Sequence, residues 1–110
     1  MKILLIVDDW EALDRYEVEL GPRFEAVPVF FGQDGISTAR LERPECMLID
    51  LTLEDMDGSD LEKEFRSDAS FDGVRIALVA EVSSVSAHPS TRVFARPFSY
   101  GEVSRFLEGK

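Results

Sequence analysis

Hydrophobic positions follow two alternating patterns along this chain. Short apolar or β-branched runs indicate strands at Ile3–Val7, Ala26–Phe31, Cys46–Leu51, Val74–Ala80 and Arg92–Ala95. Several of these runs are apolar throughout, which is typical of parallel strands whose two faces are both covered.

Stretches of helical period separate these runs. Leu13, Tyr16 and Leu20 share one face of a predicted helix, and the Gly21-Pro22 pair stops it. Three further helical faces are indicated by Ile36 with Ala39, by Leu61 with Phe65, and by Tyr100 with Val103, Phe106 and Leu107. Two capping-box pairs predict helix starts, Ser59 with Glu62 and Ser99 with Glu102.

The alternation of strands and helices predicts an α/β fold. A length of 110 residues is that of one domain, so we expect residues 1–110 to form one doubly wound, five-stranded parallel sheet with helices on both faces. The segment from Glu81 to Thr91, EVSSVSAHPST, contains four serines and a proline. It predicts a short helix at best, so the fourth helix of the domain is expected to be reduced.

Composition narrows the class of protein. The chain is 45% hydrophobic, enough for one core, and its net charge is −10 from 22 acidic and 12 basic residues. Such a surface repels phosphate backbones and anionic lipids, so we expect no direct binding to nucleic acid or membrane. The single Cys46 lies in an apolar run, and Ile3–Val7 is too short for a signal peptide or membrane span. The sequence therefore predicts a soluble, cytoplasmic protein.

Acidic residues lie at the carboxyl ends of two predicted strands, where functional sites form in doubly wound folds. Asp8 and Asp9 follow the first predicted strand, and Asp50 lies at the end of the third. In the strand order 2-1-3-4-5 these strands are neighbours, so the three carboxylates would meet at the topological switch point. Their combined charge is costly without a cation, and Mg²⁺ suits carboxylate and water ligands.

Each aspartate also has a simpler explanation. Asp9 can be the N-cap of the first helix, a role compatible with metal binding, and Asp8 can be a solvated strand end. Asp50 follows a buried-looking strand and no helix begins directly after it, so capping does not explain it.

The order of four segments resembles the receiver domain of two-component response regulators. These segments are ILLIVDD, MLIDLTLEDMDG, RIALVAE and FARPF, and together they cover essentially the whole chain. The DLTLEDMDG part is the most specific, because it joins the strand-end aspartate to an acidic turn and Gly58 at the spacing of the family.

The resemblance implies a flavodoxin-like fold and a signalling module rather than an enzyme in the usual sense. Asp50 would accept a phosphoryl group from a sensor histidine kinase or a phosphotransfer protein. Asp8, Asp9 and Asp50 would hold Mg²⁺, together with the backbone carbonyl of Thr52. No output domain follows Lys110 in this sequence. Either the protein stands alone and passes its signal to a downstream protein that the sequence does not name, or it is one module of a longer protein.

Three of the positions that depart from the pattern of that family bear on how a phosphoryl group would be bound and sensed. Val79 stands where receivers carry a threonine or serine whose hydroxyl bonds the phosphoryl group, and Val93 stands at the position of the responding aromatic. Arg96 replaces the lysine that ends the fifth strand. Arginine keeps the charge but presents a longer, planar fork.

Two hypotheses follow from this mixture of kept and altered residues. The first is a phospho-acceptor receiver with an unusual readout. The second is a receiver-like module that recognises a protein partner without phosphorylation. A haloacid-type hydrolase also uses a strand-end aspartate, but this chain is too short for its usual insertions. The sequence leaves the oligomeric state open.

Overall fold

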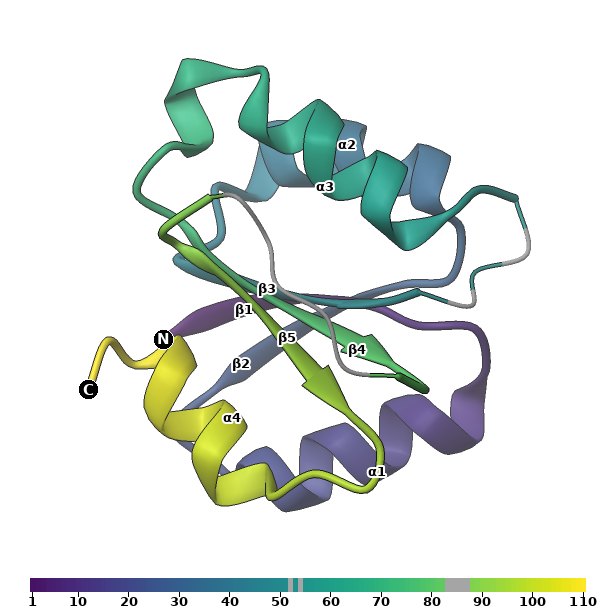
Figure 1. Cartoon of the computed structure of the whole chain (residues 1–110), viewed down its shortest axis with the longest axis vertical. Coiled ribbons are helices and arrows are strands. Elements are labelled where there is room, and N and C mark those ends of the chain that lie inside the picture. The colour runs from purple at the N-terminus through teal and green to yellow at the C-terminus, as the bar shows by residue number, and fades with distance from the viewer. Residues whose placement is uncertain (52, 54, 83–87) are drawn as a thin grey trace.

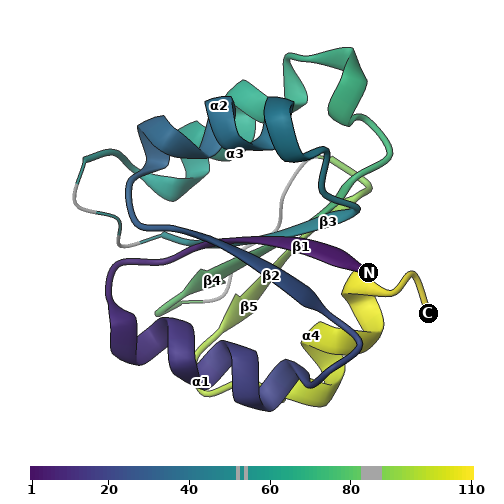
Figure 2. The ribbon, with the colours of Figure 1, turned by 180° about the vertical axis from the view of Figure 1, so that it is seen from behind.

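A parallel sheet lies between two layers of helices (Figures 1 and 2). The computed structural model describes residues 1–51, 53, 55–82 and 88–110. The strands are β1 (Lys2–Ile6), β2 (Glu25–Val29), β3 (Cys46–Asp50), β4 (Arg75–Ala80) and β5 (Thr91–Ala95). The helices are α1 (Trp10–Leu20), α2 (Gly32–Glu42), α3 (Gly58–Arg66) and α4 (Tyr100–Leu107), with a 3₁₀ turn at Ala69–Phe71.

The five strands are parallel and lie in the order β2-β1-β3-β4-β5. The fold class, the strand order and the five predicted strands are confirmed, with strand ends shifted by one or two residues. Between β4 and β5 the described residues 81–82 and 88–90 contain no helix. The predicted reduction of that helix otherwise falls on residues 83–87, which lie outside the described part of the chain.

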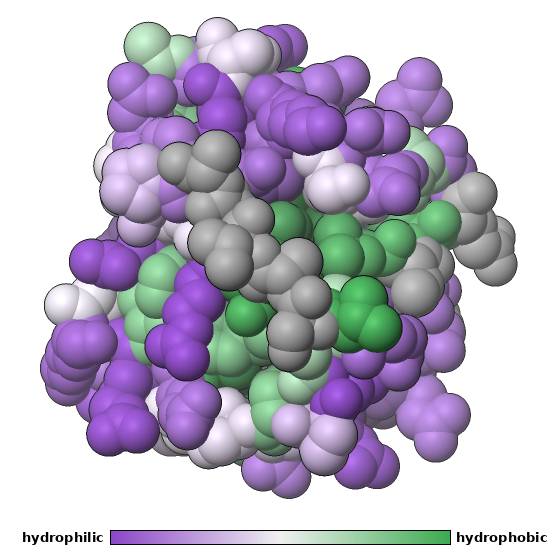
Figure 3. Space-filling view, viewed as in Figure 1, coloured by the Kyte–Doolittle hydropathy of each residue, from purple (hydrophilic) through white to green (hydrophobic). Residues whose placement is uncertain are grey.

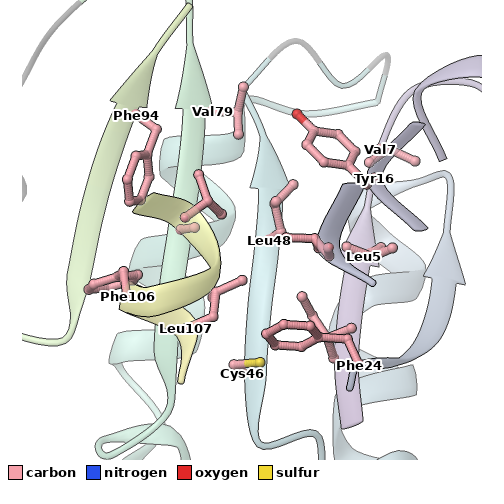
Figure 4. Close-up of a cluster of buried hydrophobic side chains, with 14 of the residues drawn as sticks. Leu5, Val7, Tyr16, Phe24, Cys46, Leu48, Val79, Phe94, Phe106 and Leu107 are labelled. Carbon is pink, nitrogen blue, oxygen red and sulfur yellow. The ribbon is translucent and has the colours of Figure 1, made fainter. Parts of the chain in front are cut away.

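Alternation along the strands divides the core into two clusters. Successive side chains of a strand point to opposite faces of the sheet. One face is covered by α1 and α4 and the other by α2 and α3 (Figures 1 and 2). Figure 4 shows the first cluster, which includes Leu5, Tyr16, Leu48, Val79 and Phe94.

Helix α1 begins and ends as its sequence predicts. The Asp9 carboxylate caps its start by accepting a hydrogen bond from the Ala12 amide at 2.7 Å. The helix ends at Gly21, whose φ of 86° lies in the region that favours glycine. Ser99 likewise caps α4, accepting from the Glu102 amide at 3.3 Å, so that predicted helix start is confirmed.

The predicted capping box at Ser59 and Glu62 is wrong. Asp57 is the N-cap of α3, and its Oδ1 accepts hydrogen bonds from both the amide and the hydroxyl of Ser59. Glu62 instead turns into the protein, where its Oε2 accepts from the Thr91 hydroxyl at 2.9 Å and lies 3.5 Å from Arg66 Nε. Because the Asp57 carboxylate already caps the start of α3, Glu62 is available to link this helix to the start of β5.

Two described residues that follow β3, Asp55 and Gly58, make close contacts with neighbouring elements. A Cβ on Gly58 would lie 2.8 Å from the Asp50 carbonyl oxygen and 2.8 Å from Leu51 Cα, so only glycine lets α3 begin this close to the end of β3. Both carboxylate oxygens of Asp55 accept hydrogen bonds at the start of α2, from the Gly32 and Gln33 amides at 2.8 and 3.0 Å. The end of β3 is therefore held from both sides.

Figure 3 shows the same view as Figure 1 in space-filling form. Hydrophobic residues gather across the middle of this face at the level of the sheet, and hydrophilic residues cover the helical layers above and below. Among the described residues, none of the helices has the length and apolar character needed to cross a membrane.

Candidate functional site

Three charged side chains meet at the carboxyl ends of neighbouring strands. On β3, Cys46 and Leu48 belong to the cluster beneath α1 and α4, so Asp50, the next residue of the same parity, faces that side as well. The same parity places Glu81 after Val79 of β4 and Arg96 after Phe94 of β5. Alternation and parallel pairing thus bring an acid, a base and a second acid to one corner of the sheet.

Arg96 bridges the two acidic groups. Its Nη2 lies 3.0 Å from Asp50 Oδ2, and its Nη1 lies 2.7 Å from Glu81 Oε1. The Asp50 side chain is 1% exposed and the Arg96 side chain 35%. Burial lowers the pKa of the guanidinium, but the hydrogen bond and charge of Asp50 outweigh this and raise it. Arg96 therefore remains a cation and covers Asp50 from the solvent side.

Asp8 follows β1 and is half-buried beside this group. Burial raises the pKa of Asp8, and the nearby Asp50 carboxylate raises it further. The Arg96 guanidinium acts in the opposite direction but does not cancel these effects. The Asp50 carboxylate at the end of the neighbouring strand β3 therefore disfavours the charged form of Asp8, as the strand order leads one to expect.

Asp9 behaves differently from Asp8. It is exposed, and its Oδ1 is engaged in the cap of α1 described above. Within residues 1–51, 53, 55–82 and 88–110, no three acidic, histidine or cysteine side chains are grouped closely enough to hold a metal ion. The predicted three-carboxylate set is therefore not assembled among the described side chains, and Thr52, its fourth predicted member, lies outside them.

The donors that remain still suit a magnesium ion. Mg²⁺ commonly binds through one or two carboxylates and completes its shell with water and phosphate oxygens. Asp8 and Asp50 form such a pair. Burial first, and then the Asp50 charge, raise the pKa of Asp8, and a cation bound beside it would offset both effects. The residues present therefore fit Mg²⁺ through Asp8 and Asp50, with Asp9 next to them in the chain.

An open cleft of about 870 Å³ lies over this corner. Asp8, Asp9 and Glu11 line one side of it, and Glu81 and Arg96 line another. Its remaining walls come from α1 and from the segment after β5, at Ala12, Arg15, Tyr16, Pro97, Phe98 and Tyr100. The cleft gives a small charged ligand access to Asp8 and Arg96, while Asp50 lies behind Arg96.

Solved structures of several response-regulator proteins share this architecture. The chemotaxis response regulator CheY4 of Vibrio cholerae superposes with a TM-score of 0.83 at 17% identity, covering 98% of this chain and 96% of that one. The receiver domain of the Francisella response regulator 1452 gives a TM-score of 0.84 at 17% identity, covering 97% and 93%. A putative response regulator of Chloroflexus aurantiacus gives 0.82 at 21% identity, covering 97% of each chain.

This chain has the receiver-domain fold. Its sequence is 31% identical to hybrid signal transduction histidine kinase D of Dictyostelium discoideum over 78 residues. This matched region is 70% of the chain. The chain spans only 5% of the length of that curated relative. No model of a protein family matches the sequence.

Val79 and Val93, the two valines singled out in the sequence, lie on β4 and β5. Val79 pairs with Asp50 across β3 and β4 and is fully buried in the cluster beneath α1 and α4. Val93 packs against the opposite cluster, whereas Phe94 is buried in the same cluster as Val79. Val93 and Phe94, which are adjacent along β5, therefore point to opposite faces of the sheet.

Sequence reasoning missed two members of this site. Glu81 was part of a segment interpreted mainly as loop, yet it completes the Arg96 bridge. Tyr16 was assigned only to the packing face of α1, yet it lines the cleft. Glu81 lies two residues after Val79, and this spacing could have revealed its position. Side chains keep alternating between the two faces of a sheet where the chain stays extended past the end of a strand. The second depends on the reach of a long side chain, which sequence spacing alone does not give.

Proposed function

We propose that this chain is a receiver module of two-component signal transduction and that Asp50 is its phosphoryl acceptor. The donor would be a sensor histidine kinase or a phosphotransfer protein, and the phosphorylated form would act on a downstream protein. The observation that carries the proposal is the grouping of Asp50, Asp8 and Arg96 at one corner of a receiver-type sheet, beneath an open cleft.

The chain's own residues divide the chemistry between them. The Asp50 carboxylate is the nucleophile, and the bond that forms joins one of its oxygens to phosphorus while the bond to the donor nitrogen breaks. Arg96 must move its Nη2 away from Asp50 Oδ2 to expose this oxygen, and it then remains close enough to pair with the transferred group. Asp8 and Asp50, with Asp9 beside them, would hold Mg²⁺, which when bound neutralises charge on the phosphoryl oxygens.

The proposal is tested by titrating the purified protein with Mg²⁺ and beryllofluoride, a mimic of the phosphoryl group. Trp10 is the only tryptophan, directly follows Asp9 and is 69% exposed with its ring 4.7 Å from that of Phe30. We expect a saturable, Mg²⁺-dependent change in its fluorescence that Asp50→Asn abolishes. No response in the wild type, with circular dichroism showing an intact fold, would contradict the proposal.

A second function is favoured by the burial of Asp50. With its side chain 1% exposed and paired to Arg96, the module could recognise a partner protein in its unphosphorylated form. Val79 and Val93 agree with this alternative, since Val79 has no hydroxyl to bond a phosphoryl group and Val93 is not the aromatic that would respond to it. The same titration separates the two functions, because the second predicts no binding of beryllofluoride.

A further inference from the structure

Tyr16 is a buried hydroxyl-bearing residue that the chemistry described so far leaves unused. It lies on α1, its side chain is almost fully buried, and it belongs to the same cluster as Leu48 and Val79. Asp50 faces this side of the sheet too, because it has the parity of Leu48 along β3. Tyr16 and the proposed acceptor therefore share one face of the sheet.

Tyr16 belongs to the core cluster and also lines the cleft. In Figure 4 its oxygen is directed toward the carboxyl ends of the strands, on the side where Val79 and Val7 lie. Tyr16 also lines the cleft together with Asp8 and Arg96. The ring is held by aromatic neighbours, being parallel to Phe98 at 6.5 Å and edge-on to Tyr100 at 5.9 Å. A ring fixed in this way aims its hydroxyl at a constant place.

The surroundings of this hydroxyl are those of a donor to an anion. The Arg96 guanidinium and the Asp50 charge both act on the pKa of this hydroxyl, the first lowering it and the second raising it. Burial raises the pKa of the Tyr16 hydroxyl, so it keeps its proton at physiological pH. Val79, the β4 residue paired with Asp50, carries no hydroxyl. Among the described residues that line the cleft, only Tyr16 and Tyr100 provide one.

We propose that the Tyr16 hydroxyl donates a hydrogen bond to an oxygen of the phosphoryl group on Asp50. This role rests on the proposed function, and it deepens it by naming the residue that recognises the transferred group. Arg96 would supply the positive charge, and Tyr16 the neutral donor from the α1 side of the sheet. No proton is transferred in this step, so it stabilises the phosphorylated state without entering the bond exchange.

The test compares Tyr16→Phe with Tyr100→Phe in Mg²⁺–beryllofluoride titrations. Each variant removes a single hydroxyl from the same aromatic group and keeps its ring, so circular dichroism and melting curves should match the wild type. We expect Tyr16→Phe to weaken beryllofluoride binding by about tenfold or more, the loss typical of a hydrogen bond to a charged group. Tyr100→Phe should change it by less than about twofold, since its hydroxyl has no assigned role there.

A rescue variant separates recognition from packing. Val79→Thr adds a hydroxyl on the same face directly across from Asp50, so in the Tyr16→Phe background it should recover most of the lost affinity. Wild-type affinity in Tyr16→Phe would overturn the role of Tyr16 and leave Asp50 as the acceptor. Failure of the wild type itself to bind beryllofluoride would overturn the proposed function and the role of Tyr16 together.

Discussion

Arg96 Nη2 lies 3.0 Å from Asp50 Oδ2, and this ion pair covers a carboxylate that is 1% exposed. The protein thus carries its own cation at the place where the sheet gathers negative charge. Arginine suits this position because its fork can serve Asp50 and Glu81 at once. A lysine, with one compact ammonium group, would not span the two acids with the same geometry.

The Arg96 pair makes a prediction about stability. Arg96→Met should destabilise the fold by about 1–3 kcal/mol, because it removes the cation from a buried carboxylate while keeping a long apolar stem. Asp50→Asn should relieve most of this loss in the double variant. Urea unfolding of the two single variants and the double variant gives the coupling energy, expected to be about 1 kcal/mol or more. Additive effects would show that the ion pair contributes nothing to stability.

Asp55 predicts a dependence of stability on pH. Hydrogen bonds from the amides of Gln33 and Gly32 lower the pKa of its carboxyl. A pKa that is lower in the folded state gives stability that is present above the unfolded value, about 3.9, and is lost as the pH falls through the folded value. Asp55→Asn keeps one acceptor and loses the other, so it should lower the melting temperature at pH 7 but not at about pH 2.

The matched control for Asp55 is Asp14, an exposed carboxylate on α1. Asp14→Asn changes the net charge by the same amount without touching the start of α2. Its melting temperature should follow that of the wild type across the pH range. A loss at pH 7 equal to that of Asp55→Asn would assign the effect to net charge and not to the cap.

The close approach of α3 to the end of β3 at Gly58 predicts that a larger side chain there is destabilising. A Cβ at this position meets backbone atoms of Asp50 and Leu51 at 2.8 Å, and backbone cannot move aside as a flexible side chain can. Gly58→Ala should cost about 1–3 kcal/mol in urea unfolding. Gly73→Ala, where a Cβ has no neighbour within 4 Å, should be neutral or slightly stabilising. Equal effects of the two substitutions would contradict the close approach of α3 to β3.

The sheet was predictable from the sequence because its signals are local and repeated. Apolar runs mark the strands, and Gly21 and Ser99 mark helix ends through the backbone geometry and hydrogen bonding of single residues. The start of α3 was missed because Asp57 and Glu62 both offer an acidic partner near Ser59, and tertiary contacts decide between them. The sequence around Ser59 does not reveal that Glu62 accepts a hydrogen bond from Thr91, because Thr91 is distant in sequence.

The candidate site was predictable only in part for a similar reason. Strand ends and strand order place Asp8, Asp50 and Arg96 together, so these residues could be named without coordinates. The directions of the side chains could not be predicted in this way. Asp9 accepts a hydrogen bond from the start of α1, and Tyr16 lines the cleft although it lies on the buried face of that helix. Long or flexible side chains choose among partners that only the folded structure brings within reach.

The most direct test of the account is transfer of a phosphoryl group to Asp50. The purified protein would be incubated with acetyl phosphate and Mg²⁺ and its intact mass followed with time, with Asp50→Asn in parallel. We predict that the wild type gains the mass of one phosphoryl group, that the gain is lost without Mg²⁺, and that Asp50→Asn shows none. An unmodified wild type whose fold is intact, or equal modification of Asp50→Asn, would contradict it.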